Sequence, residues 1–152
     1  DAALYAMAQV VGGVFGTLLA HGMFDLPLLE ASTKVRTGVA QWLSEGVASF
    51  GLVAVILAGI RFREAAVSWL VGLYIIAAYW FTASTSFANP AVAIARALTD
   101  TFAGIRPTDL PGFIGAELAG ALLALGATGW LLASPVKHEH VPVGPAPASE
   151  LN

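Results

Sequence analysis

The stretch Ser86-Phe87-Ala88-Asn89-Pro90-Ala91-Val92 decides how this chain folds, because it is irregular and lies between long apolar segments. Asn89 belongs to a residue type that favours the helix N-cap, and Pro90 to the type that favours the first helical position. The apolar run 91–98 continues the helix for roughly ten residues, or about 15 Å. That length crosses about half of a 30 Å hydrocarbon core. We therefore predict a re-entrant half-helix that begins near the midplane of a membrane, beside a polar path.

The composition is that of a membrane protein. Of the 152 residues, 57% are hydrophobic and 11% are charged, whereas an average soluble domain has about 25% charged residues. The net charge of −3 provides no basic face for nucleic acid. The chain has no cysteine, which excludes disulfides and thiol nucleophiles. Because it begins at Asp1 and enters an apolar segment almost at once, we expect a fragment whose upstream part is missing.

Four segments are long and apolar enough to cross a bilayer. They are residues 2–24, 39–60, 65–82 and 112–133. The re-entrant stretch lies between the third and the fourth. The predicted fold class is therefore an all-α membrane protein with four transmembrane helices and one re-entrant half-helix. We expect a membrane channel domain over residues 1–134 and a proline-rich, disordered cytoplasmic tail over residues 135–152.

Two of these segments resemble each other. Ala8-Gln9-Val10-Val11-Gly12-Gly13 in the first is similar to Ala116-Glu117-Leu118-Ala119-Gly120-Ala121 in the last. This similarity indicates an internal repeat of the kind that many transport proteins contain. The first copy has no re-entrant element before it, which again favours a missing upstream half. Lysine and arginine residues divide equally between the two expected sides, so charge does not set the orientation.

An Asn-Pro-Ala tripeptide that opens a half-helix between two spans resembles the major intrinsic protein family of aquaporins and glycerol facilitators. Residues 78–92 (AYWFTASTSFANPAV) and 95–105 (ARALTDTFAGI) look like a bacterial branch linked to arsenic resistance. The resemblance extends to Ser134. It implies an aquaporin-like right-handed bundle that here lacks its first two spans and its first half-helix. It also implies a passive channel, assembled as a homotetramer in the inner membrane of a bacterium.

The resemblance assigns roles to individual residues. Asn89 would donate from its side-chain amide to a passing solute while its carbonyl caps the half-helix; the alternative is a cap alone. Pro90 and Ala91 would fix the turn and let two half-helices touch. Glu45, an acid inside an apolar span, would accept hydrogen bonds from the backbone of the re-entrant loop and hold it in place. A proton relay is the alternative role for this acid.

Three further positions would form the selectivity filter of this half of the pore, namely Ala77, Ser86 and Val92. Most family members carry Arg at the position of Val92, and water-selective members carry His at that of Ala77. A wider, less polar constriction would favour polyols or undissociated arsenous acid over strict water selectivity. The alternative is that these residues only pack. Arg96, one turn beyond Val92, either replaces the missing charge at the outer mouth or pairs with Asp100.

The remaining polar groups give weaker indications. Glu117 lies where the family usually has Gln, so we expect it to be neutral or bonded to backbone. His138-Glu139-His140 has no third ligand nearby, so neither a metal nor another cofactor is predicted. No nucleophile with a partnered base is visible, so the chain is not expected to be an enzyme.

The competing function is a secondary transporter in which Glu45 and Glu117 couple an ion to the solute. Our interpretation is a channel for water, glycerol-like polyols and similar small neutral solutes, with the lipid bilayer and its own copies as partners.

Overall fold

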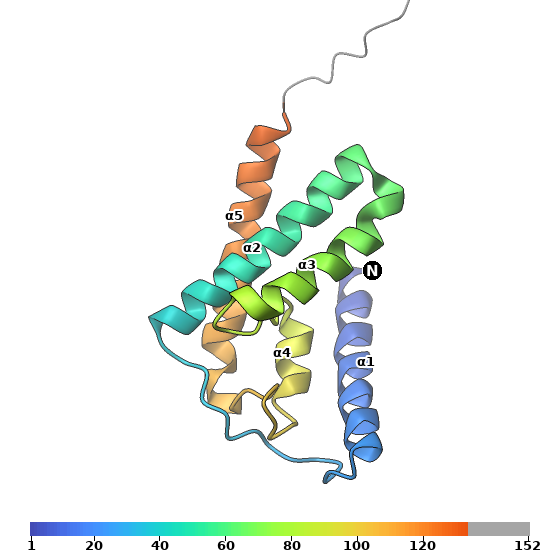
Figure 1. Cartoon of the computed structure of the whole chain (residues 1–152), viewed down its shortest axis with the longest axis vertical. Coiled ribbons are helices and arrows are strands. Elements are labelled where there is room, and N and C mark those ends of the chain that lie inside the picture. The colour runs from blue at the N-terminus through green and yellow to red at the C-terminus, as the bar shows by residue number, and fades with distance from the viewer. Residues whose placement is uncertain (134–152) are drawn as a thin grey trace, which may run out of the picture.

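The computed structural model describes residues 1–133, and these residues form helices joined by loops (Figure 1). Two of the helices are preceded by a short 3-10 turn. The elements are α1 (Ala2–Met23), α2 (Val39–Phe62), η1 (Glu64–Ala66), α3 (Val67–Phe81), α4 (Pro90–Arg96), η2 (Pro107–Asp109) and α5 (Leu110–Leu131). Four stretches are long and apolar enough to span a membrane, and they contain α1, α2, α3 and α5. The predicted all-α fold with four spans is therefore confirmed.

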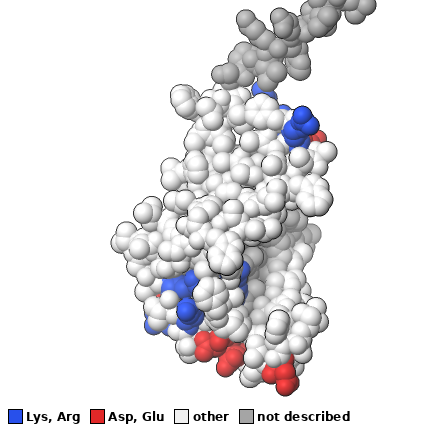
Figure 2. All heavy atoms as spheres, in the orientation of Figure 1, with Lys and Arg blue, Asp and Glu red and all other residues white. Residues whose placement is uncertain are grey.

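The surface of the molecule is suited to a bilayer. Figure 2 shows the charged residues toward the two ends of this face, with an uncharged band between them. One charged end is the turn 61–64 between α2 and α3, and the other contains the loops 24–38 and 97–109. Large apolar side chains such as Leu73 and Trp130 are exposed on the spanning helices. Such side chains are stable when they face hydrocarbon. A spanning helix is also suited to that environment, because its backbone polar groups bond to one another within the helix.

Helices α2 and α5 approach each other through two glycines. A Cβ atom added to Gly120 would collide with the backbone of Gly46. Small residues of this kind let helix backbones come close in a membrane. Glu45 precedes Gly46, and Glu117 lies about one turn before Gly120. The close approach therefore brings two acidic side chains toward the same interior.

Helix α4 lies between α1 and α5, in the half of the molecule opposite the 61–64 turn (Figure 1). It has seven residues, so it is shorter than the roughly ten-residue helix expected from the sequence. The reason lies in its last carbonyl groups. Arg96 O accepts from Ile105 N at 3.2 Å, and Ala97 O accepts from Ser32 N at 2.9 Å. Two loops thus satisfy carbonyls that further helical turns would otherwise have used.

Candidate functional site

The segment that leads into α4 has an unusual backbone. Thr85, Ser86 and Ala88 have positive φ angles of 63°, 46° and 51°. Residues with a Cβ rarely adopt this left-handed conformation, which costs about 1–3 kcal/mol each and persists only where surrounding structure imposes it. We call residues 82–88 the pore loop. Its shape must come from the groups that hold it.

Two buried glutamate side chains hold three consecutive amides of this region. Glu45, on α2, accepts from Phe87 N at 3.3 Å through Oε2 and from Ala88 N through Oε1. Glu117, on α5, accepts from Asn89 N at 3.2 Å through Oε1. Glu45 is 0% exposed and Glu117 is 2% exposed. Both acids therefore position the start of α4, and each donor that they bind is a backbone group of the chain itself.

Asn89 is fixed at both ends of its side chain. Its Oδ1 accepts from Ala91 N at 2.8 Å, the bond of an N-cap. Its Nδ2 donates to Gln9 Oε1 on α1 at 3.0 Å. An amide nitrogen carries two hydrogens, so this bond leaves one N–H without a partner among residues 1–133. The residue stays partly exposed, so a donor of fixed direction is available at the start of α4.

Gln9 was not among the predicted site residues, although the sequence carried a signal for it. Gln9 and Glu117 occupy the same position in the two similar segments, 8–13 and 116–121. The structure brings both of them to Asn89, one to its side chain and the other to its backbone. The internal similarity therefore marks a pair of groups that converge on one residue.

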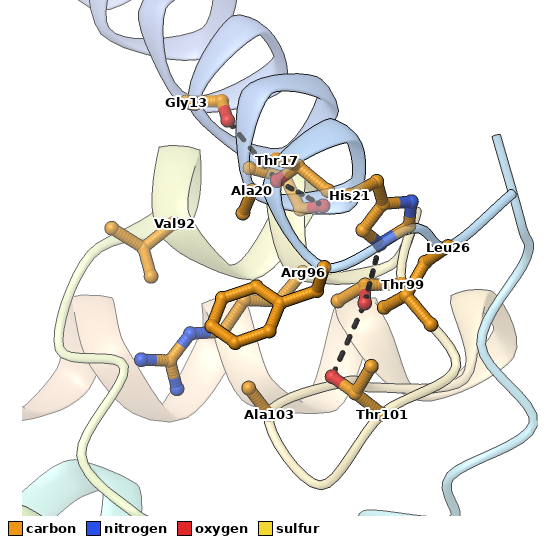
Figure 3. Close-up of a pocket in the computed structure, with 13 residues that line it drawn as sticks. Gly13, Thr17, Ala20, His21, Leu26, Val92, Arg96, Thr99, Thr101 and Ala103 are labelled. Atoms are coloured by element: carbon orange, nitrogen blue, oxygen red, sulfur yellow. Dashed lines mark hydrogen bonds between the residues drawn. The ribbon is translucent and has the colours of Figure 1, made fainter. Parts of the chain in front are cut away.

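An open cavity of about 680 Å³ lies between α1 and the end of α4 (Figure 3). Most of its wall is apolar, and Val92 is part of it. Three polar side chains of the wall form a chain of contacts: His21 Nε2 lies 2.7 Å from Thr99 Oγ1, which lies 3.1 Å from Thr101 Oγ1. The other ring nitrogen of His21 faces Pro27 O at 2.5 Å. The wall can therefore offer hydroxyl groups on one side and hydrocarbon on the other.

The three residues predicted for the filter do not meet around this cavity. Val92 lines it, whereas Ser86 is buried in the pore loop with its Oγ unpartnered within residues 1–133. Ala77 is exposed on α3. Helix α3 packs chiefly on α2, while the cavity lies against α1. The structure thus separates Ala77 from the wall that contains Val92.

The alternative in which Arg96 pairs with Asp100 is wrong. Helix α4 ends at Arg96, so Asp100 does not lie one helical turn further along the same face. Asp100 Oδ1 accepts instead from Thr33 N at 2.7 Å and from Thr33 Oγ1 at 2.9 Å. Arg96 lines the cavity beyond Val92 (Figure 3), and its Cζ lies 4.3 Å from the centroid of the Phe87 ring.

A second arginine, Arg36, lies at the same ring and was not predicted. Arg36 lies in the loop between α1 and α2, and the residue as a whole is only 4% exposed. The guanidinium donates to Gly104 O at 2.7 Å, Ser84 O at 2.9 Å and Phe102 O at 2.8 Å. Burial, and then the positive charge of Arg96, lower the pKa of Arg36. It therefore connects the pore loop to the loop that follows α4.

This geometry first defines a class of protein: a multi-pass helical membrane protein with a short, capped helix seated among its spanning helices. The chain is 72% identical over 132 residues to aquaglyceroporin AqpS of Rhizobium meliloti (strain 1021). The match covers 87% of the chain and 57% of that protein, so the chain spans little more than half the length of this relative. The chain is thus similar to an aquaglyceroporin over part of that protein's length, in keeping with the resemblance to the major intrinsic protein family that its sequence indicated.

No family model matches the chain, and no solved structure matches it. Within residues 1–133, no group of three His, Asp or Glu side chains is placed to hold a metal ion. The segment His138-Glu139-His140, and the tail predicted over 135–152, lie outside the described residues.

Proposed function

We propose that this chain forms part of a passive transmembrane channel for small neutral solutes. The observation that carries the proposal is the fixed amide of Asn89, held by Gln9 and by its own cap at the start of a short helix between spanning helices. A donor that is already oriented binds a solute oxygen without first losing conformational freedom. The similar protein of Rhizobium meliloti is an aquaglyceroporin, which is in keeping with such a channel.

The mechanism is exchange of hydration for a few protein contacts. A solute that reaches Asn89 gives up part of its water and accepts a hydrogen bond from the free N–H of this side chain. Beyond Asn89, the solute meets the cavity wall, which offers Val92 on one side and the hydroxyl groups of Thr99 and Thr101 on the other. A polyol has both a C–H surface and hydroxyl groups, so this wall suits it better than it suits a bare ion.

The preferred solutes are therefore glycerol-like polyols and undissociated arsenous acid, and water also passes because it is smaller. Val92 is the filter residue on the cavity wall, whereas Ser86 and Ala77, which do not line this cavity, would face the pore elsewhere in the complete protein. Pro90 and Ala91 hold the turn at the start of α4. We further propose a homotetramer in a bacterial inner membrane, with one pore in each subunit.

A passive channel is favoured over a secondary transporter by the state of the two acids. Glu45 uses both oxygens, and Glu117 uses one, to hold backbone amides. A carboxylate that couples an ion to a solute must exchange its ligands in each cycle. Releasing these amides would also release the strained pore loop. This favours a supporting role for the acids and no chemical step in the pore.

The test is solute flux in proteoliposomes that contain the natural full-length protein. Glycerol entry down its gradient should be non-saturating and independent of an imposed ion gradient. Val92→Arg should narrow the wall and lower glycerol permeability about tenfold, with water permeability reduced less. Equal loss for both solutes would contradict the filter assignment. Saturable uptake driven by an ion gradient would favour the transporter instead.

A further inference from the structure

We infer that Arg36 and Arg96 together determine the charge selectivity of the pore, as a pair of fixed positive charges around Phe87. The inference rests on the proposed channel function and names the residues that exclude cations from it. Both guanidinium groups lie over the same ring, with Cζ-to-centroid distances of 5.1 Å for Arg36 and 4.3 Å for Arg96. The Phe87 ring packs with Ala97 and Ile105. Both charges therefore lie alongside the last turn of α4 and the loop that follows it.

Neither charge is neutralised by an ion pair in the part of the chain that the structure describes. The guanidinium of Arg36 donates only to carbonyl oxygens, which satisfy its hydrogen bonds but leave its charge whole. Asp109 accepts from the backbone N–H of Arg36, but it forms its ion pair with Arg106 at 2.8 Å. Arg96 has one terminal nitrogen, Nη1, without a partner among residues 1–133.

The charge of Arg96 acts on Arg36, so the two positive charges lie close enough to reinforce each other. The charge of Arg96 is the second cause, after burial, of the lowered pKa of Arg36. An arginine nonetheless keeps its proton in a protein, so both remain positive at neutral pH. The acid whose charge acts on both is Glu45, and its oxygens hold the amides of Phe87 and Ala88.

The positions of the two arginines differ in a useful way. Arg96 lines the cavity on the same side as Val92 (Figure 3), so its charge acts directly on whatever enters. Three hydrogen bonds hold the guanidinium of Arg36 against the pore loop and the loop after α4, so its charge has a fixed position. Fixed charges in a low-dielectric site repel an ion far more strongly than they would in water, while a neutral solute is little affected. The pair therefore supplies a barrier to cations although residue 92 is Val.

The experiment compares sodium flux with glycerol flux in proteoliposomes of the full-length protein. Arg96→Met replaces the arginine by an apolar, unbranched side chain and so removes one charge. We expect the ratio of sodium to glycerol flux to rise about tenfold or more, because sodium flux increases. Arg63→Met is the matched control: it removes an equal charge from the exposed turn at the other end of the molecule and should leave the ratio unchanged.

Arg36→Met removes the second charge and should raise the same ratio. Two further variants keep the inference falsifiable if Arg36→Met fails to accumulate. Arg36→Lys retains the charge and should keep the low sodium flux, even if looser hydrogen bonding lowers stability. Arg96→Met combined with Val92→Arg returns a positive charge one turn away and should bring the sodium flux itself back to the wild-type level, while glycerol flux falls as expected for Val92→Arg. An unchanged ratio in Arg96→Met, an equal rise in Arg63→Met, or no rescue by Val92→Arg overturns the inference. Absence of glycerol flux in the unaltered protein would instead overturn the proposed function.

Discussion

The two sides of the re-entrant segment are built in opposite ways. On one side, α2 and α5 meet backbone to backbone at Gly46 and Gly120, and they bury the acids that hold the loop. On the other side, α1 and α4 enclose an open cavity of about 680 Å³. The difference shows how a membrane protein can combine two kinds of packing: one wall fixes irregular backbone by close contact, and the other leaves an open cavity.

The largest expected effect comes from separating α2 and α5, the closely packed side of the re-entrant segment, which we call the tight side. Gly120→Leu puts a side chain where the backbone of Gly46 lies, so α2 and α5 must separate. We expect a loss of about 3 kcal/mol in stability and loss of glycerol flux. Thermal unfolding in detergent, followed by fluorescence-detected gel filtration, measures the first effect. Gly126→Leu is the control, because a Cβ at Gly126 meets no atom within 4 Å. Similar melting temperatures for both variants would argue against a packing role for this contact.

A smaller effect is expected when the tight side keeps its shape but loses an acceptor. Glu45→Gln replaces one carboxylate oxygen by an NH₂ group, which then faces the N–H of Phe87 or Ala88. An unsatisfied buried donor costs about 2 kcal/mol. We expect a lower melting temperature and a loss of glycerol flux, because the pore loop is no longer held. Glu64→Gln, on the exposed turn, is the control. Normal flux in Glu45→Gln would remove this acid from the support of the loop.

The smallest effect should come from the open side. Gln9→Leu removes the partner of Asn89 Nδ2 but leaves the N-cap bond in place. Loss of one hydrogen bond is worth about 1 kcal/mol, or roughly a fivefold change in an equilibrium. We expect glycerol permeability to fall by about that factor with little change in melting temperature. If stability falls as far as it does in Glu45→Gln, then the two sides of the segment do not differ as described.

The sequence was sufficient for the parts of the fold that depend on length and composition. Four apolar runs predicted four spans, and Asn89 followed by Pro90 predicted the start of α4. The end of α4 could not be predicted, because two distant loops take its last carbonyls. The same loop contacts placed Asp100 against Thr33 and left Arg96 without the expected ion pair.

Arg36 was missed for a different physical reason. An arginine in a polar connection normally extends into solvent, and carbonyl groups, which every residue carries, give no sequence signal as its partners. Its partners, Ser84, Phe102 and Gly104, come from two separate loops. Gln9 was a nearer miss, since its similarity to Glu117 was visible in the two related segments.

The two acids that hold the strained loop are made at different times during synthesis. Glu45 precedes the loop in the chain, so its oxygens are present when the amides of Phe87 and Ala88 leave the ribosome. The acceptor for Asn89 N lies 28 residues later, on α5. The left-handed turn at Ala88 therefore has only one of its two anchors until the last span has entered the bilayer. Insertion of that span is the step that completes the entrance to α4.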